Sequence, residues 1–399
     1  MSGEKKTVGI LSMQSVNNFG SLIQAYSLKK MVESLGHEVC FIDIERRPED
    51  DELLKNHRIS YLSEMESGSL KRKISDGYLA NRFRNRAVGK EQDAVFNAFR
   101  DKYLPACDAG RSVDTCIIGS DEVFNCLQES GWGFTSQLFG DVKNASDVIT
   151  YAACCGFTKL ADVPAPVVEK IRESFSNISA FSVRDKNTYD FVYGITESDA
   201  ITYNLDPALL SDFDDEIAAE PVVNDLPEKY CLVYAYKNRI YEKSEVEFIK
   251  SFCKARGMEI IAVGMPQMWI KNFYAASPFE LLKIFRNAGF VITDTFHGTI
   301  FSARYADKFA VIVRESNKNK LGDLIDRLEL QDHMVHDVKE LEDKYALAHD
   351  KVKLNAQLQC EYERALGYLE ANLNDEGYSQ DGSGFAEADL DLTEADHND

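Results

Sequence analysis

The sequence has no apolar run long enough to cross a bilayer, which takes about 20 apolar residues in a helix. The chain starts MSGEKKTVGILSM, and its first apolar run, at residues 7–12, ends within a few residues. A cleavable leader needs an apolar centre of about 7–15 residues. We therefore expect a soluble, cytoplasmic protein.

Basic charge is also scarce, with 45 Lys and Arg against 66 Asp and Glu and a formal net charge of −21. Proteins that bind duplex nucleic acid need Lys and Arg to meet the phosphates, so we expect no nucleic-acid partner. Residues 374–399 hold nine of the acidic side chains and no Lys or Arg, which leaves 57 acidic against 45 basic residues, or −12, elsewhere. This acidic tail is predicted to be disordered.

Motifs for metal binding and thiol redox chemistry are missing. The nine cysteines form no C-x-x-C pair, and the seven histidines include no H-x-x-x-H. Zinc sites and redox pairs depend on such spacings. Several cysteines lie in apolar strand patterns such as VCFI and TCIIG, which favours reduced, buried thiols. We expect neither a metal nor a bound cofactor.

A chain of 399 residues is too long for one ordinary core, and strand patterns alternate with helix patterns in both halves. This predicts two doubly wound, Rossmann-like α/β domains that face a cleft. We place the first at 1–212 and the second at 225–345, followed by a helix at 346–373 and the tail at 374–399. The oligomeric state is not predicted.

A polar, helix-prone section at 46–105 interrupts the first domain, and we expect it to pack there as an insertion. It contains the basic stretch KRKISDGYLANRFRNRAVGK. A solvated helix face is the favoured interpretation. The alternative is contact with an anionic lipid-linked substrate or the membrane surface, which would place the protein peripherally at its inner face.

The first strand–helix junction lacks both G-x-G-x-x-G and a P-loop, the two usual phosphate-binding patterns. Instead, Asn17, Asn18, Gly20 and Ser21 lie just before and at the start of an amphipathic helix predicted at 21–35. Such a loop can present backbone N–H groups to an anion or polar ligand. The alternative is simple turn formation and helix capping.

Polar residues follow other predicted strands of the first domain. Since the carboxyl ends of parallel strands share one edge of a sheet, these residues and the first loop could meet there: Asn17, Asn18, Ser120, Asp121, Arg184 and Asp206. Alternatives remain for three of them. Asp121 could cap a helix, Arg184 could pair with Asp185 or Asp206, and Asp206 could begin a helix before Pro207.

One histidine stands between a strand pattern and a helix pattern. Residues 290–292 predict a strand, 299–305 a helix and 309–313 another strand, so His297 is expected in a loop at the carboxyl end of a strand. Imidazole suits acid–base chemistry there. A lone histidine is, however, more often structural. Asp294 lies nearby, and Lys318 and Lys320 follow.

Taken in order, six segments make the chain resemble the polysaccharide pyruvyl transferase family. They are NNFGSLIQAYSLKKMVESLGHEV, IIGSDEVFN, YAACCGF, SVRD, LDPALL and NAGFVITDTFHGTIFS, and they extend over residues 8–330 apart from the polar insertion. The chain departs from the family at three places. It has Glu122 and Phe124 where the family often has Gln and Trp, Cys154-Cys155 where the family has Ser-Phe, and Thr295 where the family has Ser.

The resemblance implies a glycosyltransferase-B-like pair of domains, phosphoenolpyruvate as donor and co-substrate, and a sugar or lipid-linked glycan of the cell surface as acceptor, on which a ketal forms. It implies that His297 is the general acid, with Asp294 or the donor's charge holding its proton. Donor-binding residues would be Arg184, Lys318, Lys320, Gly298 and Thr299; residues contacting the acceptor or cleft would be Asn17, Asn18, Gly20, Ser21, Ser120, Asp121 and Asp206. A nucleotide-sugar-dependent glycosyltransferase and a non-catalytic glycan-binding protein stay open as alternatives.

Overall fold

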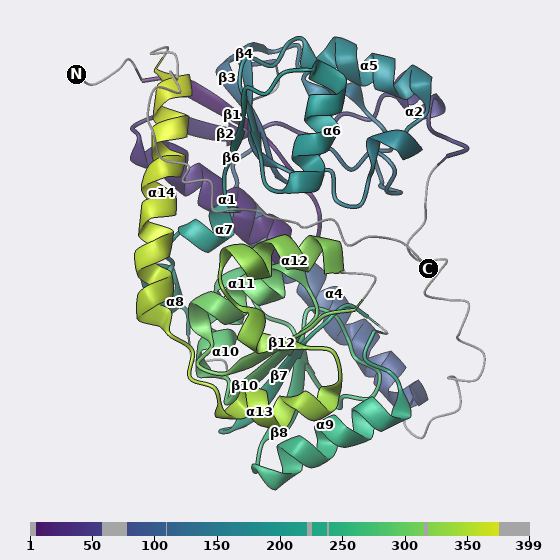
Figure 1. The fold of residues 1–399 in the computed structure, drawn as a ribbon, viewed down its shortest axis with the longest axis vertical. Coiled ribbons are helices and arrows are strands. Elements are labelled where there is room, and N and C mark those ends of the chain that lie inside the picture. Colours follow the sequence, from purple (N-terminus) through teal and green to yellow (C-terminus); the bar gives the residue numbers. More distant parts are fainter. Residues whose placement is uncertain are drawn as a thin grey trace, which may run out of the picture.

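The computed structural model describes residues 5–57, 78–108, 110–221, 226–237, 239–314 and 318–374, with backbone alone at 78–83 and 318–320. Two six-stranded sheets form two layered domains, one above the other in Figure 1. All recorded strand pairs are parallel, with helices on both faces. The predicted α/β class with two doubly wound domains is confirmed.

The first sheet has the order β2-β1-β3-β4-β5-β6. Its central strands are apolar on both faces, as expected of a parallel sheet covered by helices. The strands are β1 (Thr7–Leu11), β2 (Glu38–Phe41), β3 (Val113–Asp121), β4 (Ala145–Ala153), β5 (Phe181–Val183) and β6 (Ile201–Tyr203). The helices around it include α1 (Phe19–Ser34), α2 (Pro48–Glu52), α5 (Ala165–Phe175), α6 (Lys186–Thr196) and α7 (Pro207–Leu210).

The second sheet has the order β12-β11-β10-β7-β8-β9. Its strands are β7 (Tyr230–Tyr234), β8 (Glu259–Val263), β9 (Asn272–Tyr274), β10 (Phe290–Thr293), β11 (Phe309–Ile312) and β12 (Met334–Val335). The accompanying helices are α8 (Asp214–Ala219), α9 (Lys243–Ala255), α10 (Pro278–Asn287), α11 (Phe296–Tyr305), α12 (Lys318–Arg327) and α13 (Leu341–Ala346).

Two helices cross from one domain to the other. Helix α4 (Tyr78–Tyr103) packs Phe96 against Phe19 of α1, with ring centroids 4.7 Å apart. In the second domain, the amide of Gln92 donates to the Ala276 carbonyl over 2.8 Å and accepts from its N–H over 3.0 Å. The section therefore packs on the first domain and also reaches the second domain, which the prediction did not include. Its amphipathic pattern indicated a buried face but not which surface covers it, and residues 58–77 lie outside the described part of the chain.

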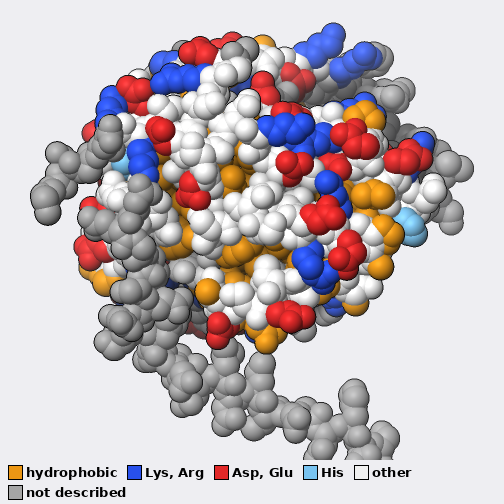
Figure 2. Space-filling model, turned by 90° about the horizontal axis from the view of Figure 1, so that it is seen from above, with side chains coloured by type: hydrophobic (Ala, Val, Ile, Leu, Met, Phe, Trp, Pro, Cys, Tyr) orange, Lys and Arg blue, Asp and Glu red, His pale blue; other side chains and the backbone are white. Residues whose placement is uncertain are grey.

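The last helix, α14 (Lys351–Leu373), returns to the first domain and lies beside both domains in Figure 1. There the Tyr368 hydroxyl donates to the Thr150 carbonyl over 2.9 Å, and Leu369 and Leu373 are fully buried. On the face seen in Figure 2, acidic and basic side chains are interspersed, with apolar atoms between them. No helix in the described ranges is both long and apolar enough to span a membrane.

One disulfide corrects the expectation that every cysteine is reduced. Cys40 of β2 and Cys107, which follows α4, are bonded, with their Cα atoms 4.8 Å apart. The chain returning from α4 runs beside β2, because Phe41 donates its N–H to Pro105 and accepts that of Cys107. A separation of 67 residues leaves no sequence signal for this pairing. The other seven cysteines are free and six of them are buried, while Cys360 is exposed.

Candidate active site

The polar stretch of chain after β10 forms the first turn of α11, so His297 lies within a helix and not in the predicted loop. Thr295 is the N-cap, and its hydroxyl accepts the Gly298 N–H over 2.9 Å. A Cβ on Gly298 would lie 2.1 Å from the Thr293 hydroxyl, so the turn has no room for a larger residue. Gly298 and Thr299 are buried parts of this turn.

His297 crosses the boundary between the domains. A Cβ built on Gly20 would lie 2.1 Å from its Nδ1 atom, which places one edge of the imidazole directly against the first turn of α1. Asn18 caps α1 by accepting the Gly20 N–H over 2.8 Å. The loop before α1 thus brings the backbone of the first domain against a histidine of the second.

We predict that Gly20→Ala lowers turnover by about 100-fold, because a shift of about 1 Å in a reacting group has effects of that size. The added methyl would collide with the His297 ring. Gly89→Ala is the matched control: Gly89 lies inside α4, where nothing beyond the adjacent backbone of its own helix lies within 4 Å of the added methyl, and the helix gains about 1 kcal/mol from alanine. Turnover of both variants is compared with that of the wild type, and equal activity in Gly20→Ala would exclude the close contact.

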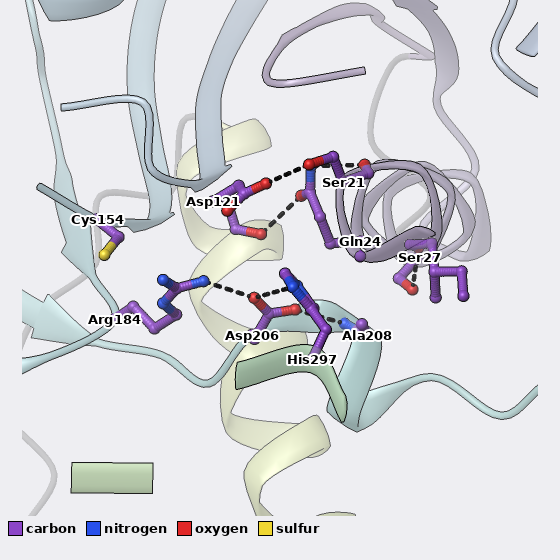
Figure 3. A network of polar contacts seen from close by, with 12 residues as sticks. Ser21, Gln24, Ser27, Asp121, Cys154, Arg184, Asp206, Ala208 and His297 are labelled. Atoms are coloured by element: carbon purple, nitrogen blue, oxygen red, sulfur yellow. Dashed lines mark hydrogen bonds and ion pairs between the residues drawn. The ribbon is translucent and has the colours of Figure 1, made fainter. Parts of the chain in front are cut away.

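The other imidazole nitrogen faces a buried carboxylate (Figure 3). Nε2 of His297 lies 3.6 Å from Oδ2 of Asp206, which is 1% exposed. The same oxygen accepts a hydrogen bond from Arg184 Nη1 over 2.9 Å, and Oδ1 accepts the Ala208 N–H over 3.0 Å. Burial alone would raise the pKa of Asp206, but His297 and Arg184 outweigh it and lower the pKa to about 2. A charged carboxylate therefore stands where it can stabilise a proton on Nε2.

Asp206 has both of the structural roles that the sequence suggested for it. It is the N-cap of α7 and also the ion-pair partner of Arg184. Asp185, the other suggested partner of Arg184, instead caps α6 by accepting the Thr188 N–H over 2.9 Å.

Arg184 has hydrogen-bond donors that its pairing with Asp206 does not use. Its side chain is 3% exposed and its guanidinium lies 4.1 Å above the Phe296 ring. Nε and Nη2 are buried and have no hydrogen-bond partner among the described residues. Arg327 of α12 donates to the Arg184 carbonyl over 3.0 Å, which brings a second guanidinium from the other domain. An unpaired buried donor is costly, and an anion would satisfy these groups.

Asp294 anchors the loop after β7, whereas the carboxylate that faces Nε2 of His297 is that of Asp206. Asp294 is fully buried and accepts the Tyr236 N–H over 2.9 Å, with Arg239 Nε 3.9 Å from its other oxygen. Burial raises the pKa of Asp294 to about 6, although the Tyr236 N–H and Arg239 act to lower it. Its contacts fix the loop after β7, which forms one wall of the pocket beside His297.

A pocket of about 350 Å³, part of it open to solvent, lies between the domains. Pockets between domains are common places for small ligands to bind. One domain supplies Asn18 and the other supplies the remaining lining residues, which are Tyr234, Ala235, Tyr236, Met265, Thr295 and His297.

The other first-domain candidates are held by internal hydrogen bonds. Ser21 donates to Asp121 over 2.7 Å, and Ser120, which is fully buried, donates to Gln24 over 2.7 Å. Asp121 has φ of 71° and does not cap a helix.

Asn17 is joined to α4, because it donates to Asp93 over 2.9 Å and accepts from Arg100 over 2.8 Å. Sequence reasoning missed Gln24, Tyr236, Arg239 and Arg327, because helical or solvated positions give no local signal for a site. The side chains of Lys318 and Lys320 lie outside the described residues. Within the described ranges, no group of three His, Cys, Asp or Glu side chains could hold a metal ion.

Comparison with solved structures finds proteins of similar extent but low identity. A UDP-GlcNAc 2-epimerase from Neisseria meningitidis bound to UDP-GlcNAc has a TM-score of 0.46 at 10% identity, covering 93% of this chain and 100% of that chain. The epimerase from Methanocaldococcus jannaschii has 0.46 at 12% identity, with 91% and 99% covered. Arabidopsis thaliana UGT89C1 complexed with UDP-L-rhamnose has 0.47 at 11% identity, with 93% and 100% covered.

A search of the curated proteins found no match. The family model described as polysaccharide pyruvyl transferase, however, matches residues 18–316. That match begins at the cap of α1, contains Arg184, Asp206 and His297, and includes strands of both sheets. The chain belongs to the polysaccharide pyruvyl transferase family.

Proposed function

We propose that the protein transfers the pyruvyl group of phosphoenolpyruvate to hydroxyls of a sugar in a cell-surface polysaccharide or its precursor and forms a ketal. The observation that carries the proposal is the chain of contacts from Arg184 through Asp206 to His297, buried at the meeting of the two domains. It combines a candidate proton donor with a guanidinium that has unused donors. Membership of the family supports a transferase acting on a polysaccharide.

In the proposed reaction, protonated His297 gives a proton to the methylene carbon of the donor, which becomes a methyl group and leaves C2 cationic. One sugar hydroxyl adds to C2 and returns its proton to the imidazole. The bond between C2 and the bridging oxygen breaks, phosphate leaves with that oxygen, and a second hydroxyl adds to C2 and yields its proton to phosphate. Asp206 stabilises the imidazolium in the charged steps.

The donor carries a carboxylate and a phosphate, and both need cationic partners. We assign one of them to the free Nε and Nη2 of Arg184, with Arg327 nearby. Lys318 and Lys320, at the start of α12, are proposed for the other. Phosphoenolpyruvate is a co-substrate in this scheme, and we propose no resident cofactor, because side chains supply both the acid and the anion partners.

The acceptor is proposed to enter the pocket beside His297, where Asn18, Tyr236 and Thr295 offer polar groups. Phosphoenolpyruvate is a cytoplasmic metabolite, so we propose a cytoplasmic reaction, with access to a lipid-linked acceptor from the inner face of the membrane.

Calorimetry distinguishes the donor classes. We predict that phosphoenolpyruvate binds the full chain and that UDP-GlcNAc does not. Arg184→Lys should weaken phosphoenolpyruvate binding by at least about 10-fold, because lysine keeps the charge but not the planar set of donors. If UDP-GlcNAc binds and phosphoenolpyruvate does not, the result would instead favour the nucleotide-sugar-dependent glycosyltransferase.

A further inference from the structure

Three tyrosines form a parallel stack on the surface of the first domain. The rings of Tyr189 and Tyr203 have centroids 5.4 Å apart and planes within 8°, and those of Tyr189 and Tyr193 are 6.2 Å apart and within 6°. Tyr193 is 48% exposed, while Tyr189 and Tyr203 are partly buried against the core. We call these three residues the tyrosine stack.

The tyrosine stack starts beside the candidate active site. Tyr203 ends the edge strand β6, three residues before Asp206, and Tyr189 lies in α6, whose N-cap Asp185 directly follows Arg184. At about 1.5 Å per residue, Tyr193 lies about 12 Å along α6 from Asp185. The stack therefore leads outward from Arg184 along the helix.

The second domain approaches the same end of the stack. Burial raises the pKa of the Tyr203 hydroxyl, and charges that add to this effect include Asp190 of α6 and Asp323 of α12. Arg327 of α12 also reaches the Arg184 carbonyl. Figure 1 shows α12 at the top of the second domain, facing the first. Residues of α12 in the second domain thus lie near the inner end of the stack.

The chemistry of the stack matches a sugar. A pyranose ring has an apolar C–H face and a rim of hydroxyls, so it binds a flat aromatic face beside charged hydrogen-bonding groups. Tyr193 keeps an exposed ring, and Lys186 and Asp190 lie on the same helix as an ion pair, with the Lys186 ammonium 5.8 Å from the Tyr189 centroid. Rings held parallel by stacking lose little freedom on binding a ligand.

We propose that the tyrosine stack binds sugar units of an acceptor glycan next to the unit that reacts. This inference rests on the proposed function, which identifies the unit that reacts. It adds that the acceptor is an oligosaccharide that extends outward along α6.

The test measures binding of cellohexaose, chitohexaose and mannohexaose to the full chain without phosphoenolpyruvate. We expect at least one of them to bind the wild type, and Tyr193→Ala to weaken that binding by about 10-fold, as loss of one aromatic contact does. Tyr193→Phe, which keeps the ring, should bind like the wild type. Because Tyr193 is exposed, Tyr193→Ala should keep the fold of the wild type, and circular dichroism checks this.

Equal affinity in the wild type and Tyr193→Ala, or no binding of any of the three hexaoses to the wild type, would overturn the proposal. The outcome is separable from that of the proposed function, because no donor is present. Hexaose binding that depends on Tyr193, together with failure to bind phosphoenolpyruvate, would retain the glycan site and reject pyruvyl transfer. Donor binding without a role for Tyr193 would do the reverse.

Discussion

Replacement of His297 by glutamine is expected to lower kcat by at least about 1,000-fold, within the range that a general acid contributes. Apart from His297, the described residues that line the pocket are Asn18, Tyr234, Ala235, Tyr236, Met265 and Thr295. Of these only the two tyrosines carry an ionisable proton, and a phenol, with an ordinary pKa of about 10, is a much weaker acid than an imidazolium. The measurement is release of phosphate from phosphoenolpyruvate in the presence of an acceptor. Donor binding by calorimetry should change little, because the proposed anion partners are not altered.

His336→Gln is the matched control for that variant. It makes the same substitution at an exposed histidine next to β12. It should keep the activity of the wild type. Circular dichroism should show the same folded state for both variants. Activity of His297→Gln within 10-fold of the control would remove His297 from the role of acid.

Asp206→Asn is expected to reduce both stability and turnover. It would leave the buried guanidinium of Arg184 without a counter-charge, and loss of one partner of a buried ion pair costs about 3–5 kcal/mol of unfolding free energy. Turnover should fall as well, because the carboxylate that faces His297 Nε2 is gone. Urea unfolding and phosphate release measure the two effects.

The double variant Arg184→Met with Asp206→Leu separates these effects. Removing both charges should recover most of the lost stability, because the desolvated charge disappears with its partner. Turnover should stay low, since neither the anion donors nor the carboxylate returns. A double variant that regains activity, or an Asp206→Asn protein as stable as the wild type, would contradict this account of the pair.

The stability that Asp206 contributes through its pair with Arg184 depends on pH, and it decreases in acid. The pKa of Asp206 is about 2 in the folded protein, whereas an unfolded aspartic acid has a pKa of about 3.9. Its contribution to stability is therefore complete above the unfolded value and is lost as the pH falls through the folded one. Asp206→Asn should lack this part of the acid dependence in urea unfolding measured down to low pH.

Much of the fold was predictable because buried parallel strands are short apolar runs between turn residues. The run at 290–292 became β10 (Phe290–Thr293), and the run at 309–313 became β11 (Phe309–Ile312). The helix after β10 begins earlier than its apolar pattern suggests, because the Thr295 hydroxyl caps it. A cap acts through one side chain and gives a weaker signal than periodicity.

The pairing within the site was harder to predict. Asp294 is the carboxylate nearest to His297 in sequence, yet its contacts are with Tyr236 and Arg239, whereas Asp206 comes from the other domain. Only the way the domains meet brings Asp206 to the imidazole. The crossing of α4 and the bond between Cys40 and Cys107 depend on the same long-range arrangement.

The central claim is tested most directly by following both products with phosphoenolpyruvate that carries a heavy-oxygen label at its bridging position. The wild type is incubated with a panel of lipid-linked and nucleotide-linked sugars, and phosphate and glycan are analysed by mass spectrometry. We predict labelled phosphate and a pyruvylated glycan in equal amounts, only when an acceptor is present. Phosphate without the label, release independent of acceptor, or no transfer to any member of the panel would contradict pyruvyl transfer.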